Sequence, residues 1–257
     1  MQRYTVPFVV LDTVMLSKNG HALLDPDAVS AMRELLLPQV DLITPNLPEA
    51  AALLGCAVAE DMTAMLAQAE AFAIPVAKKS GKSSYQSLII SKKDKGLASM
   101  AALQGKTFAF VDPSSASGHL FPKAGLMATG LDVDKGFSRT IFSGSHDASI
   151  MAVANGKVDA AAVADPIFQT AVAKGHVKAE DFQIIWRSKD IPESPMAWRR
   201  NLDEATKKKV AAALAEIKGL PWGDRGELNG FAPTNDQAYD VVRQTAKALN
   251  LDLGKMK

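Results

Sequence analysis

Several residue types and sequence features are scarce in this chain, and each scarcity excludes a class of structure. One cysteine among 257 residues excludes an internal disulfide and a cysteine-rich zinc site. The four histidines are scattered along the chain, so no spacing suited to metal ligation appears. No apolar run approaches the roughly 20 residues that cross a bilayer. We therefore expect a chain without a metal, without another cofactor and without membrane insertion.

The chain also lacks an excess of either charge. With 29 basic and 28 acidic side chains the net charge is +1, which gives no reason to expect nucleic acid as a partner. The apolar residues before Asp12 form a run too short for a secretory signal, so the chain as written is expected in the cytoplasm. A 47% hydrophobic and 22% charged composition is typical of a soluble globular protein.

The most informative segment lies between a buried-strand pattern at 107–111 and a helical pattern at about 119–128. It contains three hydroxyl side chains and a glycine, which are Ser114, Ser115, Ser117 and Gly118. Hydroxyl groups and free backbone N–H groups at the start of a helix favour an oxyanion, because the helix dipole is positive there. The alternative is that Ser115 or Ser117 only caps the helix.

A second turn of the same kind follows about thirty residues later. Ser143, Gly144, Ser145 and His146 connect a strand pattern at 139–142 with a helical pattern at about 147–154. Successive strand-to-helix turns of an open α/β sheet converge on one crevice. The two turns together predict a pocket for a tetrahedral anion, while His146 alone is equally typical of a helix-start residue bonded to local backbone.

Strand and helix patterns alternate over the rest of the chain, which indicates an α/β fold. Strands are expected at 87–91, 107–111, 139–142, 158–163 and 183–186, and the segment 95–187 should fold independently as one lobe. A strand at 196–199 and helices at about 203–218 and 235–249 should return to another lobe. The intervening segment, with Trp222, Gly223, Gly226 and Gly230, is interpreted as an irregular surface loop.

From about residue 73 to the C-terminus the sequence resembles the phosphate-, phosphite- and phosphonate-binding proteins of ABC importers. The resemblance is carried by the segments 85–90 (YQSLII), 105–110 (GKTFAF), 112–119 (DPSSASGH), 142–147 (FSGSHD), 153–160 (VANGKVDA), 185–188 (IWRS), 230–233 (GFAP) and 239–243 (YDVVR). It implies a periplasmic-binding-protein-like (type II) clamshell without catalysis, a periplasmic location for the parent family and an ABC permease as partner.

The same resemblance assigns roles to individual residues. Ser114, Ser115, Ser117 and His146 would hold the oxyanion, with Tyr85 adding a hydroxyl from the first strand that crosses between the lobes. Family members that bind aminoalkyl phosphonates carry acidic groups for the ammonium, and Ser194 is expected at one such position. A small anion such as phosphite, phosphate or methylphosphonate is therefore the first choice. Asp165 is a remaining acidic candidate, or a helix cap before Pro166.

Residues 7–56 instead resemble the middle of hydroxymethylpyrimidine phosphate kinase, a ribokinase-like enzyme. The matching segments are 9–15 (VVLDTVM), 23–25 (LLD) and 42–50 (LITPNLPEA). Strands at 8–11 and 40–44, with helices at 26–36 and from 47, form one βαβα unit with a parallel sheet. The family's glycine-rich anion hole with its catalytic cysteine has no counterpart here, which argues against kinase activity.

The two resemblances predict a fusion, with a ribokinase-like fragment at 1–72 and a phosphonate-binding-protein-like region at 73–257. Within the second region, 95–187 would be a complete lobe, and 73–94 and 196–257 would form the hinge and the remnant of a truncated first lobe. The alternatives are a kinase fragment that retains activity and a non-functional fusion of two truncated genes.

Overall fold

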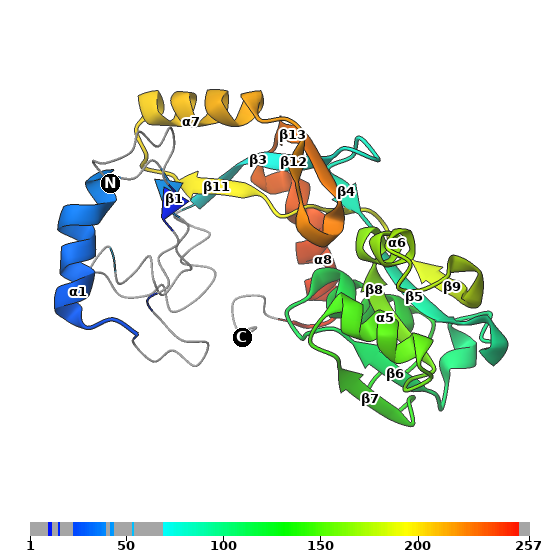
Figure 1. Ribbon diagram of the computed structural model, residues 1–257. Helices are drawn as coiled ribbons and strands as arrows, with labels where there is room; N and C mark the ends of the chain where they lie inside the picture. Colours follow the sequence, from blue (N-terminus) through cyan, green and yellow to red (C-terminus); the bar gives the residue numbers. More distant parts are fainter. Residues whose placement is uncertain are drawn as a thin grey trace. The chain divides into compact units, whose positions relative to one another are not determined.

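The computed structural model of the protein describes residues 10–11, 15, 23–39, 42–43, 53 and 69–251. The chain divides into two compact units, Met1–Met65 and Leu66–Lys257 (Figure 1). The boundary expected between residues 72 and 73 falls inside a strand that begins at Ala69.

The first unit contains a parallel strand pair and a helix. Strand β1 (Val10–Leu11) pairs in parallel with β2 (Leu42–Ile43), which confirms the parallel arrangement predicted for this segment. Helix α1 (Pro26–Ala31) continues into the π-helical turn η1 (Met32–Leu36) and the 3-10 turn η2 (Leu37–Gln39). The Asp25 side chain caps α1 by accepting the Ala28 N–H at 2.8 Å. The helix predicted from residue 47 lies outside the described residues except for Leu53.

A five-stranded sheet forms one lobe of the second unit. Its strands are β5 (Ser87–Lys92), β6 (Thr107–Phe110), β7 (Arg139–Phe142), β8 (Ala160–Ala164) and β9 (Phe182–Arg187). In the sheet order β7-β6-β8-β5-β9, the strands β7, β6 and β8 are parallel and β5 is antiparallel to both of its neighbours. The strand patterns expected here are confirmed, with ends that shift by no more than two residues.

Helices cover both faces of this sheet, as alternation along its strands requires (Figure 1). Leu88 and Ile90 of β5 belong to one buried cluster, whereas Ile89 belongs to the other. The first cluster includes residues of α5 (His146–Ala154) and α6 (Asp165–Ala173), and the second includes Leu126 of α4 (Phe121–Ala128). Because both faces are buried, the inner strands β5, β6 and β8 consist mainly of apolar residues.

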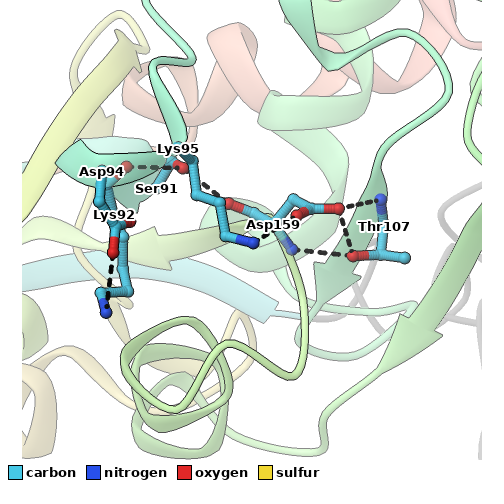
Figure 2. Close-up of polar contacts among 6 residues, drawn as sticks. All are labelled: Ser91, Lys92, Asp94, Lys95, Thr107 and Asp159. Atoms are coloured by element: carbon cyan, nitrogen blue, oxygen red, sulfur yellow. Dashed lines mark hydrogen bonds and ion pairs between the residues drawn. The ribbon is translucent and has the colours of Figure 1, made fainter.

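A polar network connects the strands at the end of the sheet opposite the two predicted turns (Figure 2). The Asp159 Oδ2 atom accepts the Thr107 N–H at 2.9 Å and its hydroxyl at 2.7 Å. Ser91 Oγ donates to the Asp159 carbonyl at 2.7 Å, and Lys95 Nζ lies 3.4 Å from Oδ1. Burial acts to raise the Asp159 pKa, but the Thr107 hydrogen bonds and the Lys95 charge hold this pKa below its ordinary value.

A second sheet in this unit is entirely antiparallel. Its order is β11-β3-β13-β12, with β3 (Ala69–Ala77), β11 (Met196–Arg199), β12 (Leu220–Pro221) and β13 (Glu227–Pro233). The strand at 196–199 and the helices α7 (Glu204–Glu216) and α8 (Asp240–Ala248) confirm the sequence prediction.

The interpretation of the Trp222 segment as an irregular surface loop is wrong. It contains β12, the 3-10 turn η7 (Gly223–Arg225) and β13. Gly226 has φ +94° at the turn and Gly230 has φ +132° at a register shift of β13, conformations that favour glycine. The glycines that suggested a loop are therefore those that let the chain turn and pair.

Two short strands connect the lobes. Strand β4 (Ser84–Tyr85) pairs antiparallel with β10 (Ile191–Pro192), with Tyr85 opposite Ile191. Beside them, Leu120, Phe121 and Ile191 pack with Ala246 of α8 in a buried cluster. No helix among the described residues has the length and apolar character needed to cross a bilayer.

Candidate ligand-binding site

The turn after β6 carries four predicted site residues, and their polar groups differ in availability. The exposed Ser114 donates its hydroxyl to Asp112 Oδ1 at 2.5 Å. The Ser114 backbone N–H also donates to this oxygen, at 2.8 Å, and the two hydrogen bonds hold the pKa of Asp112 below its usual range. Ser115 caps the five-residue π-helical turn η5 (Ala116–Leu120), because its Oγ accepts the Gly118 N–H at 2.9 Å. A capping hydroxyl acts as an acceptor, so its own proton remains available to a ligand.

Gly118 allows this turn to lie directly against the preceding strand. A Cβ atom at this position would lie 2.4 Å from Val111 Cβ. The same close approach lets the Val111 N–H donate to the Gly118 carbonyl at 3.0 Å. A glycine is therefore required here for packing rather than for an unusual backbone angle.

Ser117 is 1% exposed, and its carbonyl accepts the Ser87 hydroxyl at 2.6 Å. Its own hydroxyl takes no part in the hydrogen bonds that the Ser114 and Ser115 side chains make within the turn. Of the three serine side chains at this turn, Ser117 is thus the one that neither binds Asp112 nor caps η5.

The second turn places a neutral histidine at the start of α5. The ring Nδ1 of His146 lies 3.1 Å from the Ala164 backbone N–H, which can only donate, so Nδ1 is the acceptor. The ring proton of the neutral form is therefore on Nε2. Burial, with a smaller effect from the Arg225 charge, lowers the pKa of His146 to about 4. At neutral pH this side chain is an uncharged N–H donor.

The two turns are anchored to residues that face each other across two strands. Ser87 holds the carbonyl of Ser117, Ala164 holds the ring of His146, and Ser87 pairs directly with Ala164 in the sheet. Directly paired residues in an antiparallel sheet have Cα atoms about 4.5–5.5 Å apart. The tertiary structure therefore brings Ser117 and His146 to one edge of the sheet.

Asp165, the first residue of α6, connects this helix to Gln86, the residue between β4 and β5. Its Oδ1 accepts the Gln86 N–H at 2.8 Å, and its own N–H donates to the Gln86 carbonyl at 3.0 Å. The N-cap of α6 is Ala164, so Asp165 does not cap the helix as the alternative interpretation supposed. Burial raises the pKa of Asp165, against the hydrogen bond from Gln86.

A cavity of about 820 Å³ lies beside the connecting strand β4, and its lining includes Tyr85 and Asp165 of the predicted residues. The predicted serines, Gly118 and His146 are not among the lining residues. The Tyr85 ring faces the guanidinium of Arg225, with 4.6 Å from Cζ to the ring centroid. Figure 1 shows β4, which carries Tyr85, between the two sheets of this unit. The structure therefore gathers the predicted residues in two groups, one at the sheet edge and one along the cavity.

The sequence analysis missed a buried ion pair in this cavity. Glu193, 2% exposed, accepts a hydrogen bond from Arg225, and both residues line the cavity. Burial raises the pKa of Glu193, whereas the Arg225 charge lowers it. Ser194, which was expected at an acidic position, is exposed. The sequence shows Glu193 and Arg225 32 positions apart, and no motif or spacing in it indicates that their side chains form an ion pair.

Comparison with known proteins gives two family matches. Residues 57–239 match the model described as "ABC transporter, phosphonate, periplasmic substrate-binding protein", and residues 1–84 match the phosphomethylpyrimidine kinase model. The chain is 31% identical over 185 residues to the phosphate-import protein PhnD of Mycolicibacterium smegmatis, covering 63% of this chain and 57% of that protein. It is 60% identical over 68 residues to the hydroxymethylpyrimidine/phosphomethylpyrimidine kinase of Escherichia coli, which covers 26% of each.

A solved structure supports the first match. The binding protein component of an ABC phosphonate transporter from Pseudomonas aeruginosa has a TM-score of 0.57 and 26% identity, covering 86% of this chain and 72% of that one. The fold is thus that of the type II periplasmic binding proteins. The chain spans about a quarter of the kinase's length and 57% of the mycobacterial relative's. By its matching residues 57–239, the chain belongs to the family of phosphonate-binding, periplasmic substrate-binding proteins of ABC transporters.

Proposed function

We propose that this chain binds a small phosphorus oxyanion (phosphonate, phosphite or phosphate) for an ABC importer. The ligand oxygens would accept hydrogen bonds from the Ser115 and Ser117 hydroxyls and from His146 Nε2. Ser114 and the Gly118 turn would complete the first loop, and Tyr85 would add its hydroxyl from the hinge. Methylphosphonate, phosphite and phosphate remain the first choices, and Asp165 is a further proposed ligand-binding residue.

The anchoring of Ser117 and His146 to the paired residues Ser87 and Ala164 carries this proposal. It supports two donors at one sheet edge, each held by a hydrogen bond from the rigid strands rather than by a mobile loop. Preorganised donors lose little conformational entropy when an anion binds. A hydrogen bond to a charged group contributes about 1.5–3 kcal/mol, so a few such bonds are sufficient for micromolar affinity.

Isothermal titration of the full chain with phosphite, phosphate, methylphosphonate and 2-aminoethylphosphonate tests the proposal. We expect the first three to bind, and Ser117→Ala or His146→Asn to weaken binding about tenfold or more. Ser138→Ala is the matched control, since this exposed serine makes no side-chain hydrogen bond among the described residues. Absence of heat with every anion at millimolar concentration would contradict a binding function.

We further propose the division of labour along the chain. Residues 95–187 would hold the oxyanion, and 73–94 with 196–257 would supply the hinge and the remaining part of the other lobe. The permease of the importer is the proposed protein partner. Stimulation of permease ATPase activity in vesicles by ligand-loaded protein, and not by His146→Asn, would support this arrangement.

We also propose that the segment at 1–72 does not act as a kinase. The match to the kinase covers 26% of that enzyme's length, and the family's cysteine-bearing anion hole has no counterpart in the sequence. ATP consumption with hydroxymethylpyrimidine as the phosphate acceptor is the direct assay. Turnover above that of a heat-denatured sample would overturn this part of the proposal.

A further inference from the structure

We propose that Arg225 is a specificity-determining residue of this site, which favours dianionic phosphorus ligands and disfavours those that carry an ammonium group. The inference rests on the proposed oxyanion binding and names the residue that would set its charge selectivity. Arg225 lies in η7, outside the segments that the sequence analysis connected with the ligand.

The guanidinium of Arg225 is positioned by two aromatic rings. Its Cζ atom lies 4.6 Å from the Tyr85 ring centroid and 5.5 Å from that of Trp222. The turn that carries it is closed by hydrogen bonds, from the Arg225 N–H to the Trp222 carbonyl at 3.0 Å and from the Trp222 N–H to the Gly226 carbonyl at 2.8 Å. Stacking on aromatic faces suits the planar guanidinium and would be weaker for a lysine.

The charge of Arg225 is also the least screened in the cavity. Its side chain is 25% exposed and its partner Glu193 3% exposed. Three lysines also line the cavity, and all are exposed: Lys78, Lys79 and Lys82. The Lys78 and Lys82 side chains are 54% and 64% exposed, and their carboxylate partners Glu227 and Asp190 are 42% and 51% exposed. Interactions between exposed charges are largely screened by salt, whereas partly buried ones are not. Arg225 is therefore the basic side chain of the cavity whose charge is least screened by solvent, and the paired Glu193 carboxylate offsets part of this charge.

This charge adjoins the proposed ligand site through Tyr85, a proposed ligand-binding residue whose ring centroid lies 4.6 Å from the Arg225 Cζ atom. Repulsion from Arg225 contributes to the depressed pKa of His146, so the same charge would attract an anion that is hydrogen bonded to the His146 ring. A ligand ammonium in the same place would be repelled.

Glu193 opposes this effect and is itself firmly held. Its N–H donates to the Ser83 carbonyl at 3.0 Å, and its carbonyl accepts the Tyr239 hydroxyl at 2.9 Å. An incoming anion must compete with this carboxylate for Arg225. Removal of each partner should therefore change anion affinity in opposite directions, which a purely structural role of the pair would not do.

The experiment is titration of Arg225→Gln, Arg225→Lys and Glu193→Gln with methylphosphonate and 2-aminoethylphosphonate. We expect Arg225→Gln to weaken methylphosphonate binding about tenfold to a hundredfold and to weaken the aminoethyl ligand less. Arg225→Lys should recover part of the affinity, and Glu193→Gln should tighten methylphosphonate binding. Arg243→Gln is the control, since Arg243 is ion-paired with Asp236 and Asp240 outside the cavity lining.

The outcomes separate this inference from the function on which it rests. If the unmodified chain binds methylphosphonate and Arg225→Gln binds it equally well, the inference is wrong and the proposed function stands. If both the Arg225 and Glu193 variants weaken binding and lower the melting temperature together, the pair is structural and the inference is also wrong. If the unmodified chain binds no anion, the proposed function fails, and the selectivity role with it.

Discussion

Replacing His146 with asparagine separates the roles of its two ring nitrogens. The asparagine Oδ1 takes the place of Nδ1 and can accept the Ala164 N–H, which donates to the histidine at 3.1 Å. The Nε2–H donor has no counterpart in asparagine. The His146→Asn variant should therefore keep the junction between β8 and α5 and lose the group proposed to bind the ligand. The same variant also removes a titrating group from the protein.

The expected stability effect follows from the pKa of His146, which falls from an ordinary 6.5 to about 4 in the folded protein. Between these values the unfolded chain takes up a proton that the folded chain does not. The contribution of the neutral His146 to the free energy of unfolding is therefore largest above pH 6.5 and is lost as the pH falls toward 4. A difference of about 2.5 pKa units corresponds to about 3 kcal/mol over this interval.

Two measurements check this reasoning. An NMR titration of the histidine Cε1–H signals, with the His146 signal identified by its loss in His146→Asn, should give a midpoint near 4. The unfolding free energy of the unmodified protein minus that of the variant should decrease by about 3 kcal/mol between pH 7 and 4. The difference is needed because His119 has a lowered pKa, whereas Asp165 and Glu193 have raised ones. A midpoint near 6.5 would refute the buried, neutral histidine.

Three further substitutions test the packing around the site. Gly118→Ala should destabilise the lobe by about 1–3 kcal/mol in denaturant unfolding and weaken anion binding, because its Cβ would lie 2.4 Å from Val111 Cβ. Asp159→Asn should cost about 1–3 kcal/mol at pH 7, where Thr107 binds the carboxylate, and this loss should shrink only as the pH falls below 3.8 toward the lower pKa that Asp159 has in the folded protein. Gly230→Ala should lower the melting temperature, since its φ is +132° and a backbone oxygen lies 2.8 Å from the added Cβ; an unchanged melt would contradict the bulge.

The inner strands of the five-stranded lobe could be predicted because β5, β6 and β8 are short, mainly apolar segments with polar or charged residues close to their ends. Residues such as Leu88, Ile89 and Ile90 face buried clusters on both sides, so their pattern is the same whichever neighbour they pair with. The four-stranded sheet was harder to predict. Its strand β3 has an alanine-rich sequence containing Pro75, and β13 contains Gly230, so neither has the usual composition of a strand.

The sequence alone determined the two serine-rich turns, the α/β class of the lobe and the family resemblance, because these depend on local composition and motif order. Only the tertiary structure decided how the two turns are held: the Ser87 hydroxyl binds the Ser117 carbonyl, and the Ala164 N–H binds the His146 ring. It also decided that Glu193 meets Arg225 in the cavity. Contacts between residues far apart in the sequence depend on how the strands pair in space, and the local residue pattern does not predict that pairing.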